Sequence, residues 1–159
     1  VYGCRLFAAL WQQRGMPGHL VNVASMASIA PPANLSAYVA SKYAVEGLSE
    51  VLAMEFQGMG ITVSCLHPGV INTAIVQDSS RTHMAPEEVA RLQRHYVEHG
   101  DHPRVVAQDI ANGVASGAGT ILSGTGVARV AFMKRLLPRR TFRRLLIDAS
   151  RKMGYLPLK

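Results

Sequence analysis

Short apolar runs alternate with helical repeats along this chain, in the order typical of an α/β protein. Runs rich in Val, Ile and Leu at residues 19–24 and 61–66 predict buried parallel strands, and residues 119–123 predict a last strand. Between these runs apolar residues recur every three or four positions, which predicts helices. The predicted helices cover residues 1–14, Asn34 or Ser36 to about Gln57, 86–99, and 103 to about 116.

The carboxyl-terminal segment differs from the rest in charge. Residues 129–152 hold nine Lys and Arg against the one acid Asp148, a net charge of +8 in a chain whose total is +7. Apolar residues recur at helical spacing on both sides of Pro138, so two basic amphipathic helices are predicted. Such helices can lie on an anionic membrane, bind nucleic acid or pack on their own domain. We favour self-packing or an oligomer contact, then a membrane, and expect no nucleic acid.

Composition limits the class of protein. A chain of 159 residues that is 48% hydrophobic can bury one core and is too apolar for disorder. No run approaches the ~20 apolar residues that span a membrane, and we recognise no signal peptide. Cys4 and Cys65 have neither metal nor redox spacing, which favours a reduced setting. We therefore expect a cytoplasmic protein, with peripheral membrane contact through the basic tail as an extension.

Candidate chemistry gathers between the first predicted strand and the helix that follows it. Ser25 falls at the carboxyl end of that strand, where open α/β sheets bind ligands. Tyr38 and Lys42 are four residues apart near the helix start and share one face. A phenol keeps its proton up to about pH 10, and a nearby cation favours the phenolate. Tyr155 also precedes a lysine by four residues, but Pro157 argues against a helix there.

These residues resemble the motifs of the short-chain dehydrogenase/reductase family. Ser25, Tyr38, Lys42 and the later segment Pro68-Gly-Val-Ile-Asn-Thr73 match that family in order and spacing, and the likeness is good over residues 1 to 75. It implies that Ser25 orients the substrate oxygen, Tyr38 transfers the proton and Lys42 holds the nicotinamide ribose. It also implies a partial Rossmann-like doubly wound parallel sheet, the carboxyl-terminal half of that fold, in residues 1–124, followed by the basic helical tail 125–159.

The resemblance implies a cofactor, NAD or NADP, and a substrate, a small alcohol or ketone. Apolar residues near the site favour a lipophilic substrate. The residues implied to contact the cofactor are Tyr38, Lys42, Pro68, Gly69, Ile71 and Thr73. The family's catalytic asparagine and Gly-rich phosphate-binding turn would lie before Val1, so we expect the whole protein to be longer and residues 1–159 alone to be inactive. A noncatalytic chain with a membrane-associating tail is the alternative.

Two further expectations concern assembly and histidines. Members of the family pair through the helices that match residues 1–14 and 36–57, so the full chain is expected to be a homo-oligomer. Residues 74–103 correspond to the family's substrate loop. His95 and His99 are four apart on a predicted helix, but no carboxylate is placed to complete a site, and we expect no metal. His67 is interpreted as a turn residue.

Overall fold

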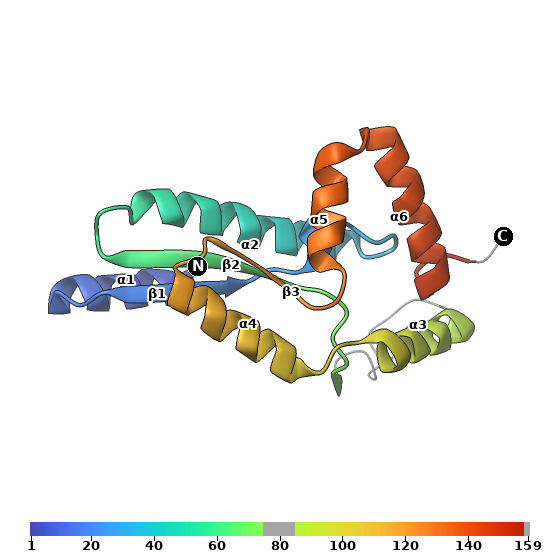
Figure 1. The fold of residues 1–159 in the computed structure, drawn as a ribbon, viewed down its shortest axis with the longest axis horizontal. Helices are drawn as coiled ribbons and strands as arrows, with labels where there is room; N and C mark the ends of the chain where they lie inside the picture. The colour runs from blue at the N-terminus through green and yellow to red at the C-terminus, as the bar shows by residue number, and fades with distance from the viewer. Residues whose placement is uncertain (75–84, 158–159) are drawn as a thin grey trace.

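The computed structural model describes residues 1–74 and 85–157, which form a three-layer α/β arrangement (Figure 1). Its three parallel strands have the order β1-β2-β3. The strands are β1 (Gly18–Val23), β2 (Ile61–Pro68) and β3 (Thr120–Ser123). The helices are α1 (Tyr2–Arg14), the 3-10 turn η1 (Met26–Ser28), α2 (Ser36–Glu55), α3 (Pro86–His99), α4 (Pro103–Ser116), α5 (Val127–Leu136) and α6 (Arg139–Met153). The predicted α/β class and parallel sheet are confirmed.

The central strand β2 carries most of the sheet's burial. Leu66 is 1% exposed, and β2 pairs with β1 from Gly18 opposite Ile61 onward and with β3 on its other side. The prediction that the first strand is buried like a central strand holds only in part, because Val23 is 51% exposed. Among the described residues β1 pairs on one side only, so it lies at an edge of the sheet.

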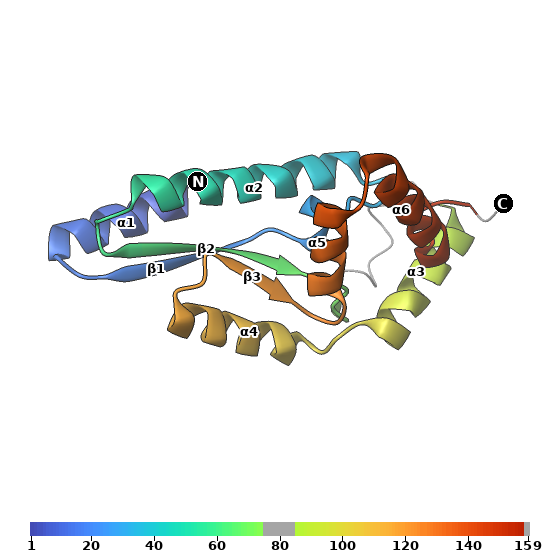
Figure 2. The same ribbon diagram turned by 45° about the horizontal axis from the view of Figure 1, so that its top comes forward.

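Helices cover both faces of the sheet (Figure 2). α1 and α2 lie on one face, and α4 lies on the other against β2 and β3. Beneath α1 a core cluster joins Cys4 and Ala8 to Leu20, Ile61 and Val63. Fully burying an aliphatic side chain contributes roughly 1.5–3 kcal/mol. The buried faces of these helices therefore stabilise the sheet, whose parallel strands all end at the same edge.

The helix that carries Tyr38 begins at Ser36, not at Asn34. Asn34 has a φ of 61°, which is outside the helical region, and it is the one non-glycine residue with positive φ in the described part of the chain. Its side-chain amide donates to the Tyr155 carbonyl oxygen at 2.6 Å. The Asn34 side chain, at one of the two predicted helix starts, is therefore bonded to a distant residue of the tail.

The tail forms the two predicted helices, α5 and α6, and both pack on the rest of the chain. Figures 1 and 2 show α3, α5 and α6 gathered at the end toward which the strands point. Val127 is fully buried and Phe142 is 9% exposed. A Cβ on Gly154 would lie 2.7 Å from the Glu88 carbonyl oxygen, so the end of α6 fits closely against α3. Across the described residues, none of the helices is long and apolar enough to cross a membrane.

Candidate active site

Ser25 lies just beyond β1 and begins the turn η1. Its extended backbone (φ −171°) lets the Oγ accept the main-chain N–H of Ala27 at 3.1 Å. This is an ordinary N-cap, which fixes the direction of the side chain. Among the described residues, the Ser25 O–H donates to no protein acceptor. The hydroxyl is therefore held by one bond and keeps its own proton for a ligand.

Tyr38 and Lys42 lie together on one face of α2. The Lys42 Nζ is 5.6 Å from the centre of the Tyr38 ring and donates to the Val23 carbonyl oxygen at 3.1 Å. Tyr38 is 44% exposed, so a ligand can reach its phenol. Because Val23 ends β1 and η1 packs against α2, the lysine ties the tyrosine's helix to the strand end that leads to Ser25. No hydrogen bond joins Ser25 to Tyr38 directly among the described residues.

The segment 68–73 leaves the carboxyl end of β2 and passes close to β3 and α5. The Gly69 N–H donates to the Ser123 carbonyl oxygen at 2.9 Å. A Cβ at Gly69 would lie 2.6 Å from Val127 Cγ2, closer than real Cβ contacts. Glycine is therefore required by a close approach at this position. Thr73 is partly exposed.

Asp101 holds this segment in place, a role that the sequence analysis missed. Its backbone bridges Ile71 and accepts the N–H of Asn72 at 3.0 Å. Its carboxylate accepts both the N–H and the hydroxyl of Thr125, in the turn between β3 and α5. The cap of α4 is supplied by His102, whose ring nitrogen accepts an N–H of the first turn. Asp101 therefore fixes the loop after β2 to the loop after β3.

His67 is not a turn residue, and that prediction is wrong. It belongs to β2, is 2% exposed, and places its Nδ1 3.1 Å from the Oγ of the fully buried Ser28. The sequence signal was present: a polar residue stands inside a buried strand directly before Pro68. It could not reveal the partner, which is 39 residues away.

Two further phenols lie near Tyr38. The hydroxyls of Tyr96, on α3, and Tyr155, just beyond α6, are 3.3 Å apart. Burial raises the pKa of Tyr96 and, much more strongly, that of Tyr155, and the Tyr38 phenol adds a smaller rise to each. Both hydroxyls therefore stay protonated at neutral pH. α3 and the tail therefore bring a bonded pair of neutral hydroxyls near Tyr38, and Tyr155 itself is only 6% exposed.

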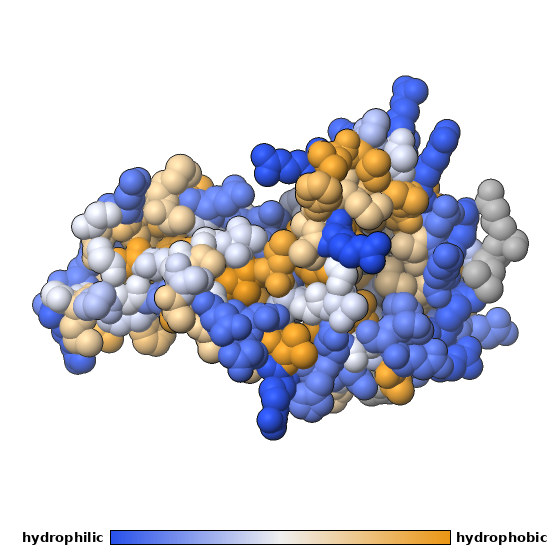
Figure 3. Space-filling view, viewed as in Figure 1, coloured by the Kyte–Doolittle hydropathy of each residue, from blue (hydrophilic) through white to orange (hydrophobic). Residues whose placement is uncertain are grey.

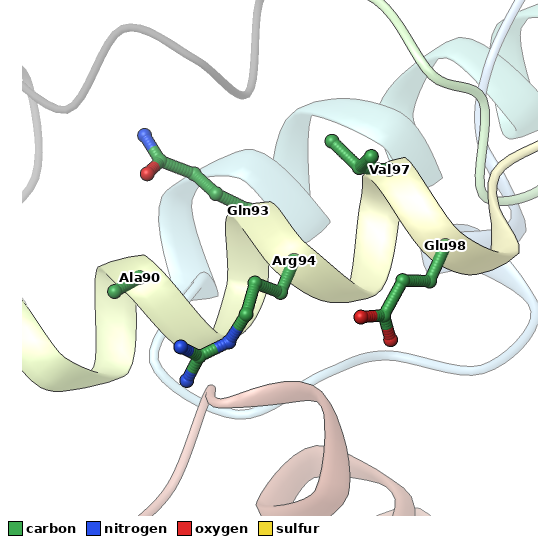
Figure 4. A pocket seen from close by; sticks show the side chains of 5 residues that line it. All are labelled: Ala90, Gln93, Arg94, Val97 and Glu98. Carbon is green, nitrogen blue, oxygen red and sulfur yellow. The ribbon is translucent and has the colours of Figure 1, made fainter.

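Other candidate features lie apart from these residues. The His95 and His99 rings stack at 4.7 Å, and the described residues contain no group of three side chains arranged to hold a metal. An open hollow of about 320 Å³ runs along α3 (Figure 4). It is lined by Ala90, Gln93, Arg94, Val97 and Glu98. None of the predicted site residues lines it, so it is not the candidate active site.

Comparison with known proteins agrees with the family resemblance found in the sequence. The profile described as short chain dehydrogenase matches residues 1–84. The chain is 34% identical over 94 residues to cyclohexanol dehydrogenase of Acinetobacter sp., covering 59% of this chain and 35% of that protein. It is 38% identical over 73 residues to 3beta-hydroxysteroid dehydrogenase 1 of Eggerthella lenta, covering 46% and 28%.

A solved structure aligns along nearly the whole chain. It is a short-chain dehydrogenase/reductase from Burkholderia phymatum in complex with NAD, with a TM-score of 0.72 and 25% identity, and the alignment covers 99% of this chain and 57% of that one. The chain thus spans well under two thirds of the length of these relatives. The likeness includes both the sheet and the tail helices.

Proposed function

Because this chain belongs to the short-chain dehydrogenase family, we propose that the protein carrying it interconverts an alcohol and a carbonyl compound, with NAD or NADP as the hydride carrier. One observation carries the proposal. The Lys42 ammonium lies 5.6 Å from the Tyr38 ring and is tied at 3.1 Å to the end of the strand that leads to Ser25. The three side chains of the expected mechanism therefore belong to one small region at the carboxyl end of β1.

In the oxidation, Tyr38 as phenolate takes the proton of the substrate hydroxyl while the carbinol C–H bond breaks. The bound nicotinamide would accept that hydrogen with its electron pair, so the substrate leaves as a neutral carbonyl compound. The Ser25 O–H donates to the substrate oxygen and holds it near the phenol, as a positioned donor does for developing charge. Lys42 stabilises the phenolate. In the reduction, Tyr38 returns the proton.

The residues present fit the nicotinamide end of the coenzyme. An ammonium has three N–H donors, and among the described residues Lys42 gives one to Val23 and lays its charge over the Tyr38 ring. Two donors are left for the ribose hydroxyls. Gly69, without a side chain, permits close approach of the main chain, and Thr73 supplies a hydroxyl. Pro68 and Ile71 would frame the ring from the same segment.

We propose a lipophilic cyclic secondary alcohol, or the matching ketone, as the substrate. Two relatives are named for such molecules, cyclohexanol and a 3beta-hydroxysteroid. The neighbouring pair of phenols agrees with this, because the half-buried Tyr96 brings an aromatic ring and a neutral hydroxyl near Tyr38, and the buried Tyr155 bonds to that hydroxyl from within the chain. A charged substrate would find no fixed opposite charge among these two phenols.

We further propose a cytoplasmic homo-oligomer that touches membranes peripherally. α1 exposes Leu6 and Phe7 (69% and 53%), and α2 exposes Met54 (67%), which suits pairing of these helices with a second copy. On the tail, α5 exposes Phe132 and Leu136, each 63%. Figure 3 shows apolar surface gathered around α5 with strongly hydrophilic groups beside it. Such a mixture suits an anionic lipid surface.

Replacing Tyr38 by phenylalanine tests the catalytic part of the proposal in the protein at its full natural length. Tyr38→Phe removes the proton-transfer group, and turnover of cyclohexanol should fall by about 10²–10⁴-fold or more while coenzyme binding by calorimetry persists. Tyr43→Phe, on the same helix and 41% exposed, is the matched control and should retain turnover. Near-normal kcat in Tyr38→Phe would refute the assignment. If the unaltered protein showed no coenzyme-dependent turnover of any cyclic alcohol tested, the noncatalytic alternative would be favoured.

A further inference from the structure

The carboxyl end of β2 contains a polar pair sealed from solvent. His67 is 2% exposed, Ser28 is fully buried, and the His67 Nδ1 lies 3.1 Å from the Ser28 Oγ. Burying an imidazole and a hydroxyl costs free energy unless their hydrogen bonds are made. The two side chains approach each other within hydrogen-bonding distance, and both also approach the main-chain carbonyl oxygen of Ser25.

Three groups converge on the Ser25 carbonyl oxygen. It accepts the Ser28 N–H at 3.0 Å and the Ser28 hydroxyl at 2.8 Å, and the His67 Nδ1 stands 3.3 Å away. A carbonyl oxygen can only accept, and the Ser28 proton is already given to it. The network thus assigns a proton to Nδ1 of His67, which donates to the Ser28 Oγ and toward the Ser25 oxygen.

This network sets the direction of the Ser25 side chain. With the Ser25 carbonyl pinned from β2 and its Oγ pinned by the Ala27 N–H at 3.1 Å, little rotation is left at this residue. His67 also immediately precedes Pro68 and Gly69, the start of the segment assigned to the nicotinamide. The buried ring of His67 therefore lies against the backbone of the substrate-orienting serine, and the main chain of His67 leads directly into the loop assigned to the coenzyme.

We propose that His67 and Ser28 are a positioning pair, which holds the Ser25 hydroxyl in register with the hydride carrier. The proposal rests on the proposed function, since it assigns a role toward Ser25 in that reaction. Neither residue touches substrate. Their effect is geometric, and a displacement of about 1 Å can cost about 10²-fold in rate. A merely structural role would instead lower stability and leave the rate of each folded site unchanged.

Three variants of His67 separate these roles in the full-length protein. His67→Asn places an amide nitrogen where Nδ1 stands and keeps the donor. His67→Gln reaches only the position of Nε2, and His67→Leu has no donor at all. We expect kcat per coenzyme-binding site to fall roughly 10- to 100-fold in the Gln and Leu variants, with the coenzyme KM little changed. The Asn variant should stay within a few-fold of the unaltered protein.

Ser28→Ala keeps the test decisive if a His67 variant fails to fold. It removes only the hydroxyl, should lower kcat in the same way, and should not add to His67→Leu, because the two act as one unit. Equal kcat per site in the Asn, Gln and Leu variants, or an unaffected Ser28→Ala, would overturn the positioning role. Tyr38→Phe serves as the reference. If the unaltered protein turns over no faster than Tyr38→Phe, the proposed function fails and this inference falls with it.

Discussion

Adding one methyl group at Gly69 measures how tightly the segment 68–73 is held against α5. In Gly69→Ala the new Cβ would lie 2.6 Å from Val127 Cγ2 and 3.4 Å from the Ser123 carbonyl oxygen. Val127 is fully buried and β-branched, so its side chain has little freedom to turn away. Gly69 is not among the glycines with positive φ, so the cost comes from the contact and not from the backbone.

The cost should divide between stability and coenzyme binding. Overpacking a close-packed site by one methyl group costs about 1–3 kcal/mol. The segment can relieve the contact by moving away from α5, which shifts the groups assigned to the nicotinamide. A loss of about 1.4 kcal/mol in binding is a tenfold weaker Kd. We expect the coenzyme Kd of Gly69→Ala to rise by about that factor, and its urea midpoint to fall.

A second substitution should relieve the first. Val127→Ala alone deletes two methyl groups and should cost about 1.6 kcal/mol or more, at about 0.8 kcal/mol per buried carbon. In the double variant the methyl group added at position 69 occupies the vacated space. The loss of unfolding free energy in the double variant should therefore be smaller than the sum of the two single losses by about 0.5–3 kcal/mol. Calorimetry with NAD and NADP and urea unfolding measure both quantities. Additive costs, or an unchanged Gly69→Ala protein, would refute the packing argument.

Gly47→Ala is the matched control, since it adds the same methyl group inside α2, where nothing lies within 4 Å. Alanine is favoured over glycine in a helix by about 0.5–1 kcal/mol. The control should therefore stabilise the protein slightly and leave coenzyme binding unchanged. If Gly69→Ala destabilises the protein while Gly47→Ala stabilises it, the cost at position 69 comes from the contact with Val127.

Other consequences can be measured separately. Leu66→Ala, at the buried end of β2, should lower the free energy of unfolding by about 2–5 kcal/mol in urea titrations, and a loss below about 1 kcal/mol would contradict its central place. Tyr96→Phe and Tyr155→Phe should each cost about 1 kcal/mol, but together less than their sum, because either leaves the other hydroxyl without its partner. The tail 125–159 should confer binding to anionic liposomes that weakens with salt; equal binding to neutral vesicles would remove the electrostatic part.

Secondary structure followed from local patterns, and so it could be predicted. The apolar runs became β1 and β2 within one or two residues, and the Tyr38–Lys42 spacing placed both side chains on one helix face because that depends only on helical geometry. The position of Ser25 beyond β1 followed for the same reason. Strand ends and helix faces are set by neighbours in sequence.

The supporting polar network could not be predicted, because each partner is distant in sequence. His67 meets Ser28 across 39 residues, and Asp101 meets Thr125 across 24. A histidine before Pro-Gly is typical of a turn until the strand is seen to run on to Pro68 and bury the ring. Charge patterning likewise left the tail open between a membrane and its own domain, since an amphipathic face does not name its partner.

The structure shows how the tail uses its inner face. Hydrogen bonds join it to the segment between β1 and α2, from Lys134 Nζ to the Ser28 carbonyl (3.3 Å), from the Ala33 N–H to Ser150 Oγ (3.2 Å), and from Asn34 Nδ2 to the Tyr155 carbonyl (2.6 Å). The same segment begins with Ser25 and leads to Tyr38. The inner face of the tail therefore supports the candidate active site, whatever its outer face binds.

Deleting the tail would accordingly be a poor test of membrane binding, because it would also release the segment that carries Ser25. Arg140, Arg143 and Arg144 are exposed and make no hydrogen bond or ion pair within the described residues. Replacing these three by Gln removes charge from the outer face and spares the inner contacts. Liposome binding should then fall, since each basic residue near an anionic surface contributes about 1 kcal/mol, while turnover in solution stays unchanged. If liposome binding and turnover both fell, the two faces of the tail would not be independent.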